Sequence, residues 1–221
     1  MIKNNYDYAL FDLDGTLTDP SLGITNSIMH ALAKMGREIP PRSELYKFIG
    51  PPLVPSFCEF FGMTDDEALT ALRFYREYFS TKGLFENVPY DGISDTLAEI
   101  KRRGVTLALA TSKPEDFAVQ ILEHFGLAEY FTKICGATMD ERRTKKAEVV
   151  LYAMESLGIT DTANSRIVMV GDRLHDIDGA HENSIPAIGV TWGFGSMDEL
   201  KTAGADFIAG SMTELISAVT Y

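Results

Sequence analysis

The chain has 221 residues, of which 45% are hydrophobic and 24% charged, and its formal net charge is −12. This balance is typical of a soluble globular protein with one large domain, or a large domain and a smaller one. An acidic chain without a Lys/Arg run of the size that such binding needs is not expected to bind nucleic acid. The absence of a span-length apolar run or signal-peptide pattern predicts a cytoplasmic protein without membrane contact.

The first predicted element is a buried strand over Tyr8–Phe11, followed at once by Asp-Leu-Asp-Gly-Thr at positions 12–16. Unbroken apolar runs are typical of parallel strands, which are covered on both faces. Open parallel sheets bind ligands beyond the carboxyl ends of their strands. We therefore expect Asp12 and Asp14 to lie where chemistry usually takes place.

Residues 18–86 are expected to be all-helical. One helix is predicted over Leu22–Met35, and another runs from Thr64, which fits a capping box with Glu67, to about residue 79. A Pro-rich corner lies between the two helices. A helical insert directly after the first strand suggests a cap over the carboxyl end of the sheet.

Strands and helices alternate over the rest of the chain. Further strands are expected at 106–110, 166–170, 186–190 and 206–209, with a short extra one at Ile134-Cys135. Helices are expected at 114–125 and 146–157, and after Ser196 and Ser211, each of which fits a capping box with the glutamate three residues later. This alternation predicts an α/β fold: a Rossmann-like, three-layer parallel sheet core over 1–17 and 87–221, with the all-helical cap domain inserted over 18–86.

Two groups suited to anions follow the later strands. Thr111 and Ser112 end the strand at 106–110, where hydroxyls and backbone N–H groups could bind an anion at a helix N-terminus, although an ordinary helix cap is the alternative. Lys146 opens an amphipathic helix, a position where the helix dipole disfavours a cation. This mismatch hints at a further role for Lys146, although such a lysine is usually a solvated side chain. The neighbouring Lys145 is an alternative candidate for the same further role.

A second acidic pair follows the strand at 166–170, in the sequence Gly-Asp-Arg-Leu-His-Asp at positions 171–176. Asp172 and Asp176 offer hard oxygen ligands of the kind that suits Mg²⁺. His175, between them, is expected to be a turn residue rather than a metal ligand.

The first acidic pair admits two other interpretations when taken alone. An Asp-x-Asp start also opens an EF-hand loop, but the sixth and twelfth positions of that loop would be Leu17 and Gly23 instead of Gly and Glu. The other interpretation, an aspartate-rich turn that caps a helix, stays open when the first motif is considered alone.

The four motifs in this order resemble the haloacid dehalogenase superfamily of phosphohydrolases over essentially the whole chain. The resemblance rests on Asp-x-Asp-Gly-Thr at 12–16 together with Gly-Asp-x-x-x-Asp at 171–176, and the helical insert resembles the C1-type cap of that superfamily. The stretches at 48–53, 111–114 and 171–176 are most similar to its phosphoglycolate phosphatase and 5′-nucleotidase-like branch. The resemblance implies a phosphomonoesterase that acts on a small phosphorylated metabolite.

The resemblance also implies roles for the carboxylates. Asp12 would be the nucleophile and form an aspartyl-phosphate, while Asp14 would be the general acid and base. The cofactor would be Mg²⁺, held by Asp12, the backbone carbonyl of Asp14, Asp172 and Asp176. Dehalogenating members of the superfamily do not need the second aspartate, so Asp14 favours phosphoryl transfer over cleavage of a carbon–halogen bond.

Substrate contacts are implied in the same way. Lys146 and the Thr111 hydroxyl would hold the phosphoryl oxygens, with help from the backbone at Ser112. The segment Lys47–Leu53 of the insert could contact the substrate, although its Pro-rich corner could equally be a rigid connection between helices. Arg42 and Lys47 are the nearest cations for a carboxylate or second phosphate of the substrate.

Other functions remain open at this point. A phosphosugar mutase would use the same aspartate pair and return the phosphate to a sugar, and a non-catalytic regulator would bind phosphate on this fold without turnover. A dinucleotide enzyme is not expected, because Gly193-Phe194-Gly195 lacks a third glycine and follows a late strand. The protein could be a monomer or a homodimer.

Overall fold

The computed structural model describes residues 5–140, 142–162 and 164–220. The chain divides into two compact units, one made of Met1–Thr18 and Pro89–Tyr221 and the other of Asp19–Val88. It passes between them on two short strands that pair with each other, β2 (Thr18–Asp19) and β3 (Val88–Pro89). None of the described helices is both long and apolar enough to cross a membrane.

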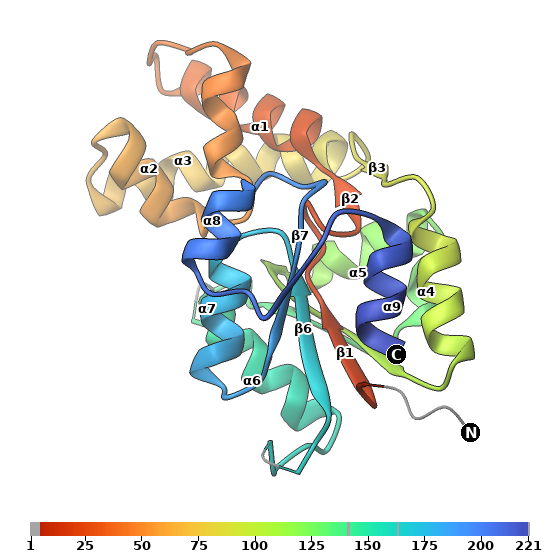
Figure 1. Ribbon diagram of the computed structural model, residues 1–221. Helices are drawn as coiled ribbons and strands as arrows, with labels where there is room; N and C mark the ends of the chain where they lie inside the picture. The colour runs from red at the N-terminus through yellow and green to blue at the C-terminus, as the bar shows by residue number, and fades with distance from the viewer. Residues whose placement is uncertain (1–4, 141, 163, 221) are drawn as a thin grey trace. The chain divides into compact units, whose positions relative to one another are not determined.

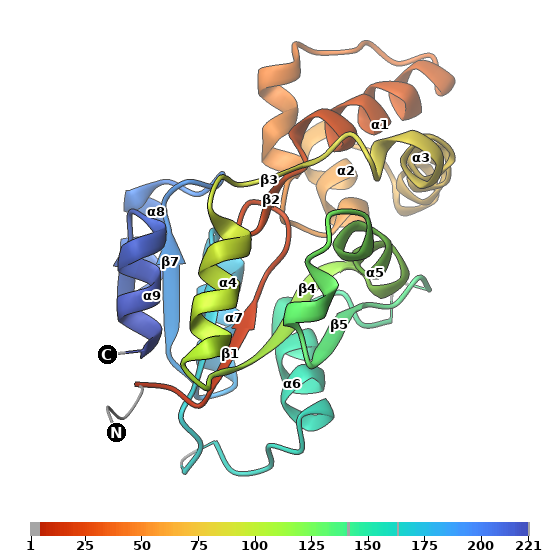
Figure 2. The same cartoon turned by 90° about the vertical axis from the view of Figure 1, so that its right-hand side faces the viewer.

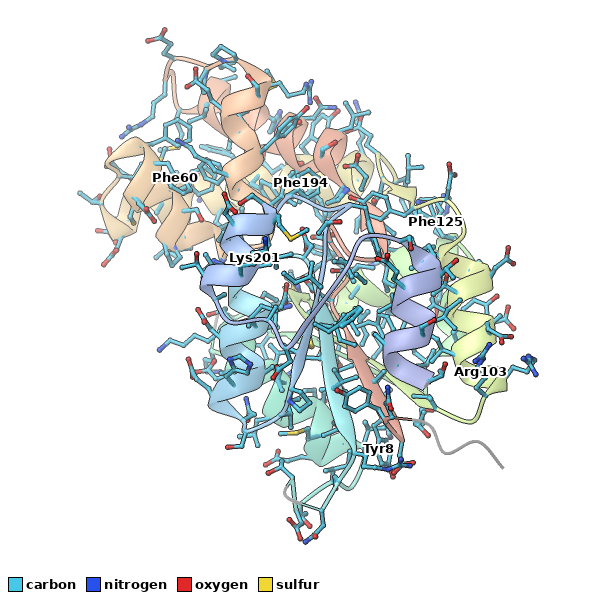
Figure 3. All side chains as sticks on the ribbon, viewed as in Figure 1. Tyr8, Phe60, Arg103, Phe125, Phe194 and Lys201 are labelled. Carbon is cyan, nitrogen blue, oxygen red and sulfur yellow. The ribbon has the colours of Figure 1, made fainter. Side chains whose placement is uncertain are left out.

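The first unit is built on a six-stranded sheet with the order β5-β4-β1-β6-β7-β8, in which every neighbouring pair is parallel. The strands are β1 (Tyr8–Phe11), β4 (Thr106–Pro114), β5 (Lys133–Ala137), β6 (Ile167–Gly171), β7 (Ala187–Val190) and β8 (Phe207–Ala209). The prediction of a parallel α/β sheet is confirmed, and each predicted strand is present. Figure 3 shows Tyr8, at the start of β1, and Phe194, after β7, at opposite ends of this unit.

Helices cover both faces of the sheet. They are α4 (Ile93–Arg102), α5 (Glu115–His124), α6 (Lys146–Ser156), α7 (Leu174–Glu182), α8 (Met197–Thr202) and α9 (Met212–Thr220), with a 3₁₀ turn, η3, at Ala128–Tyr130. Helices α6 and α7 lie on one face, and α4 and α9 lie on the other (Figures 1 and 2). Leu10 and Met169 on the central strands belong to one buried cluster with Val150 of α6 and Ile177 of α7. The adjacent Ala9 and Val168, which point to the opposite face, are also fully buried, so the strands carry apolar residues on both faces.

Two of the predicted capping boxes form only in part. Ser196 accepts a hydrogen bond from the backbone N–H of Glu199 (3.0 Å), but the Glu199 carboxylate accepts from Leu174 N (2.9 Å), at the start of α7, instead of from Ser196. Ser211 likewise accepts from Glu214 N (3.3 Å), while the Glu214 carboxylate accepts from the N–H of Gly210 (2.7 Å), the residue before Ser211. Each glutamate carboxylate accepts from one of these other N–H groups instead of from the backbone N–H of its own capping serine. The second hydrogen bond of each capping box therefore does not form.

The second unit is all-helical. Its elements are α1 (Ser21–Lys34), η1 (Arg42–Phe48, a 3₁₀ helix), α2 (Leu53–Phe61), α3 (Asp65–Tyr78) and η2 (Phe79–Gly83, a π-helical turn). The helices that were predicted match α1 and α3, and Thr64 and Glu67 form the full capping box of α3. Helix α2 was not predicted; it begins directly after the Pro-rich corner, and its Phe57 packs on the buried Phe48 with ring centroids 5.3 Å apart.

Candidate active site

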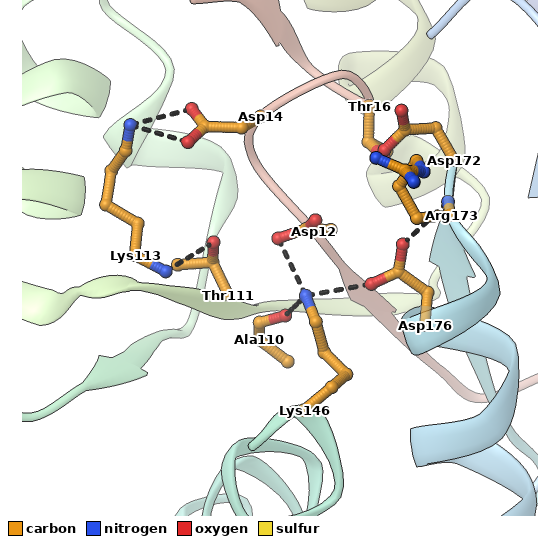
Figure 4. A network of polar contacts seen from close by, with 10 residues as sticks. All are labelled: Asp12, Asp14, Thr16, Ala110, Thr111, Lys113, Lys146, Asp172, Arg173 and Asp176. Carbon is orange, nitrogen blue, oxygen red and sulfur yellow. Dashed lines mark hydrogen bonds and ion pairs between the residues drawn. The ribbon is translucent and has the colours of Figure 1, made fainter. Parts of the chain in front are cut away.

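The turn that follows β1 presents two aspartates in different directions (Figure 4). Asp12 still belongs to the sheet ladder, because its N–H donates to the Val170 carbonyl of β6 at 2.9 Å. The carbonyl of Leu13 then accepts hydrogen bonds from the N–H groups of Leu17 (2.9 Å) and Thr18 (3.1 Å), which closes a tight turn. The strand therefore fixes Asp12, while the turn carries the Asp14 side chain toward β4.

A buried lysine joins Asp12 to the second acidic pair. Lys146, on the first turn of α6, places its Nζ 2.8 Å from Asp12 Oδ1 and 2.8 Å from Asp176 Oδ1, and donates to the Ala110 carbonyl at 3.2 Å. Its neighbour Lys145 is exposed. Of the two lysines that competed for this position in the sequence, the structure places Lys146 among the carboxylates, where the opposite charges offset the unfavourable helix dipole.

Asp172 and Asp176 lie at the end of β6 and on the first turn of α7. Asp176 Oδ2 accepts from the backbone N–H of Arg173 at 3.0 Å, so this carboxylate caps the N-terminus of α7, where the dipole favours a negative charge. His175, expected in a turn, is instead a residue of α7. Helix α7 was not predicted from the sequence, because the chain turns directly from β6 into it.

Burial raises the pKa of both acids in this pair. For Asp172, the nearby charges of Asp176 and Asp12 raise the pKa further. For Asp176, the ion pair with Lys146 opposes the effect of burial without cancelling it. Burial also disfavours the charged form of Lys146, but Asp12 and Asp176 outweigh it and raise the pKa of the ammonium. Among the described residues, the cluster thus has three carboxyl groups for one ammonium, and a further positive charge would be needed to keep all three ionised.

Asp14 has a cation of its own, which the sequence analysis did not assign. Lys113 Nζ lies 2.8 Å from Asp14 Oδ1 and 2.6 Å from Asp14 Oδ2, and both side chains are buried. The register between β4 and β5 shifts between Thr111 and Pro114, so two residues of β4 bulge out of the ladder. Such a bulge re-aims a side chain, and here the bulge includes Lys113. The only sequence signal was its place beside Thr111 and Ser112.

The environment of Asp14 favours its protonated form. Burial raises the pKa of this carboxyl, and the charge of Asp12 acts in the same direction. Lys113 and, more weakly, Lys146 lower the pKa but do not overcome the burial. A raised pKa makes a carboxyl group a better store of the proton that a general acid has to give.

The predicted phosphate-binding residues occupy different places. Thr111 is buried and its Oγ1 accepts from Lys113 N at 3.2 Å, which leaves the hydroxyl hydrogen available for a ligand. Ser112, beside it in the bulge, is partly buried. Lys47 belongs to the helical unit, where its Nζ lies over the Phe60 ring, 4.3 Å from the centroid.

Three acids are close enough to share a metal ion. Asp12, Asp172 and Asp176 are buried, and each offers one oxygen such that these atoms all lie within 4.8 Å of one another. Asp12 Oδ1 and Asp176 Oδ1 are paired with Lys146 by distance, yet neither accepts a well-directed hydrogen bond from the described residues. Buried carboxylate oxygens with unused lone pairs, in a site of excess negative charge, fit a hard divalent cation.

Comparison with known proteins shows the family to which the chain belongs. A family model described as haloacid dehalogenase-like hydrolase matches residues 9–190, which span both acidic pairs. A 5′-nucleotidase from Pseudomonas aeruginosa is 45% identical over 89% of this chain and 87% of its own length. The tyrosine-protein kinase PtkA of Mycobacterium tuberculosis is 39% identical over 93% of this chain and 69% of its own length.

A solved structure is similar over nearly the whole chain. It is a predicted phosphatase from Clostridium acetobutylicum, with 49% identity, a TM-score of 0.91 and coverage of 96% of both chains. The family match covers most of the chain and includes the strand ends that carry the aspartates. The chain therefore belongs to the haloacid dehalogenase-like hydrolases and is a phosphoric monoester hydrolase of that family.

Proposed function

We propose that the protein is a Mg²⁺-dependent phosphomonoesterase that hydrolyses a small phosphorylated metabolite through an aspartyl-phosphate on Asp12. One observation carries the proposal: two aspartates of one turn have separate cations. Asp12 Oδ1 lies 2.8 Å from Lys146 Nζ, and Asp14 Oδ2 lies 2.6 Å from Lys113 Nζ. This separation suits one carboxylate that attacks and another that moves a proton.

In the first half-reaction, a carboxylate oxygen of Asp12 attacks phosphorus and forms a new P–O bond. The bond to the leaving alkoxide breaks, and Asp14 gives its proton to that oxygen. Asp14 can store this proton because burial raises its pKa. The difficult displacement is thereby divided into two easier steps.

In the second half-reaction, Asp14, now a carboxylate, takes a proton from a water molecule. The resulting hydroxide attacks phosphorus, the bond to Asp12 breaks, and inorganic phosphate is released. Asp14 again holds its proton, and Asp12 is again a carboxylate. The Lys113 ammonium orients Asp14 in both halves, because it contacts both oxygens of that carboxylate.

The phosphoryl oxygens need positive charge and hydrogen-bond donors. Lys146 supplies a buried charge beside Asp12, and Thr111 a buried hydroxyl at the end of the ladder. Asp12, Asp172 and Asp176 would hold Mg²⁺, with the backbone carbonyl of Asp14. When bound, the ion would supply the charge that lets these carboxylates and a phosphate dianion share one site.

We infer the class of substrate from the relatives that this chain resembles. The relative from P. aeruginosa is named a 5′-nucleotidase, which favours a small phosphate monoester such as a nucleotide; the resemblance noted above adds phosphoglycolate. We propose that the helical unit, Asp19–Val88, acts as a cap that sets this choice, with Lys47 contacting a second anionic group of the substrate.

The experiment measures phosphate release from p-nitrophenyl phosphate and a panel of phosphorylated metabolites, with Mg²⁺. Asp12→Asn should lose at least about 10³-fold in kcat, since an amide has no carboxylate oxygen with which to form the acyl phosphate. Borohydride reduction after an acid quench should convert residue 12 of the wild-type enzyme to homoserine, read by peptide mass. Asp116→Asn, at an exposed aspartate of α5, is the matched control and should retain full activity.

Other outcomes identify other functions. Full activity of Asp12→Asn would exclude the proposed nucleophile. Isomerisation of a sugar phosphate with little phosphate release would indicate a phosphosugar mutase. Transfer of phosphate from ATP to a tyrosine peptide would extend to this chain what the name of the M. tuberculosis relative says of that protein. Tight phosphate binding without turnover would indicate a regulator.

A further inference from the structure

The loop that follows β7, Trp192–Gly195, packs against the site through its backbone. Phe194 N–H donates to Asp172 Oδ2 at 2.7 Å, so a peptide group of this loop occupies one oxygen of a buried carboxylate. Within the described part of the chain, the other oxygen, Oδ1, accepts a long hydrogen bond of 3.4 Å from the Thr16 hydroxyl. One lone-pair direction of Asp172 is thus fixed by the loop, and the other oxygen is left for a ligand.

The approach of the loop to Asp172 is too close for side chains. A Cβ at Gly193 would lie 2.3 Å from Asp172 Oδ2 and 2.4 Å from the Gly15 carbonyl oxygen, and a Cβ at Gly195 would lie 1.9 Å from the Asp172 carbonyl oxygen. These distances are shorter than real carbon–oxygen contacts. The two glycines, which form no dinucleotide-binding motif, are therefore required by contact with Asp172.

The same loop also holds the turn that follows β1. The indole Nε1 of Trp192 donates to the Thr16 carbonyl at 3.1 Å, four residues after Asp12. Through Phe194 and Trp192, one short loop is bonded to both segments that carry acids of the cluster. Strands β1 and β6 are neighbours in the sheet, whereas β7 neighbours β6 but not β1, so the loop adds a bond from the end of β7 to the turn after β1 that strand pairing does not supply.

We infer that Trp192–Gly195 is a positioning loop for the divalent cation, and that its bonds set how tightly Asp172 and Asp12 hold that ion. The inference rests on the metal site of the proposed function. Groups that orient a ligand from behind typically change metal affinity about 10–100-fold when they are lost. In the proposed mechanism the loop contacts neither the substrate nor the attacking oxygen of Asp12. Its effect on turnover should therefore arise through metal binding, and the affinity for Mg²⁺ should change together with the turnover.

The experiment is calorimetric titration of Mg²⁺ into metal-free protein, together with thermal unfolding with and without Mg²⁺. Gly193→Ala should weaken Mg²⁺ binding about 10–100-fold. Trp192→Phe keeps a six-membered aromatic ring and removes the N–H donor together with the rest of the indole, so it should weaken binding in the same direction by a smaller factor and retain the fold. Gly210→Ala is the matched control, because a Cβ there would meet no atom closer than 3.3 Å.

Asp172→Asn separates this inference from the proposed function. If Asp172→Asn loses Mg²⁺ binding while Gly193→Ala and Trp192→Phe bind it like the wild type, the loop has no positioning role. If Asp172→Asn binds Mg²⁺ as tightly as the wild type, the metal site itself is wrong. Should Gly193→Ala fail to fold, Trp192→Phe decides the question alone.

Discussion

Helix α7 passes so close to Lys146 that residue 179 has no room for a side chain. A Cβ at Gly179 would lie 2.7 Å from Lys146 Cγ and 3.0 Å from the backbone nitrogen of Ala147. The lysine stem carries the ammonium that lies 2.8 Å from both Asp12 Oδ1 and Asp176 Oδ1. Gly179→Ala should therefore move a charge in the site, although the substitution itself is apolar and lies outside the acidic cluster.

Two opposing effects set the change in stability. Alanine in a helix interior is favoured over glycine by about 1 kcal/mol. An added methyl group in a close-packed contact costs about 1–3 kcal/mol, and here part of the contact is backbone, which cannot turn away. We expect a net loss of about 1 kcal/mol, which corresponds to about 2–4 °C in Tm for a chain of this length. A displacement of Lys146 by several tenths of an ångström should lower kcat about tenfold or more.

The assay combines thermal unfolding with steady-state kinetics on p-nitrophenyl phosphate. Asp178→Ala, at an exposed position of the same helix, is the control: its helix propensity rises without a packing cost, and its kcat should stay unchanged. If Gly179→Ala were more stable than the wild type and equally active, α7 would not constrain Lys146, and the reasoning would be refuted.

Three further predictions follow from the described contacts. Lys113→Met should raise the pKa of Asp14, because Lys113 lowers it; the pH–rate profile should move to higher pH and kcat should fall about tenfold or more, and an unchanged profile would contradict the pairing. The pKa of Glu99 is lowered from 4.5 to about 2 by hydrogen bonds from Arg102 and Arg103, so its stabilising effect is present above pH 4.5 and lost as the pH falls toward 2. Glu99→Gln should therefore have a lower urea midpoint than the wild type at pH 7, with a difference that shrinks below pH 4.5; a constant difference would contradict this origin. Mg²⁺ at 100 times its dissociation constant should stabilise the protein by about 2.7 kcal/mol, and an unchanged Tm would argue against a metal site.

Several parts of the site could not be predicted from the sequence because their partners are distant along the chain. Lys113 meets Asp14 only through a two-residue irregularity in the pairing of β4 with β5, and no local pattern encodes that register. Glu199, the glutamate of the Ser196 capping motif, accepts from Leu174 N at the start of α7 instead. The first N–H groups of a helix have no partner within the helix, and the Glu199 carboxylate satisfies this one. Local propensity predicts which groups need partners, and the tertiary structure decides which partners they find.

The sequence by itself determined the strands, their parallel arrangement and the edge of the sheet at which the aspartates lie. Those features follow from local hydrophobic runs and from the rule that ligands bind at the carboxyl ends of parallel strands. Only the tertiary structure decided that Lys146 rather than Lys145 faces Asp12, that Asp14 is paired with Lys113, and that the backbone of Phe194 holds Asp172. Distances of about 3 Å between groups as far apart along the chain as Asp12 and Lys146 depend on how layers pack, and packing is a property of the whole fold.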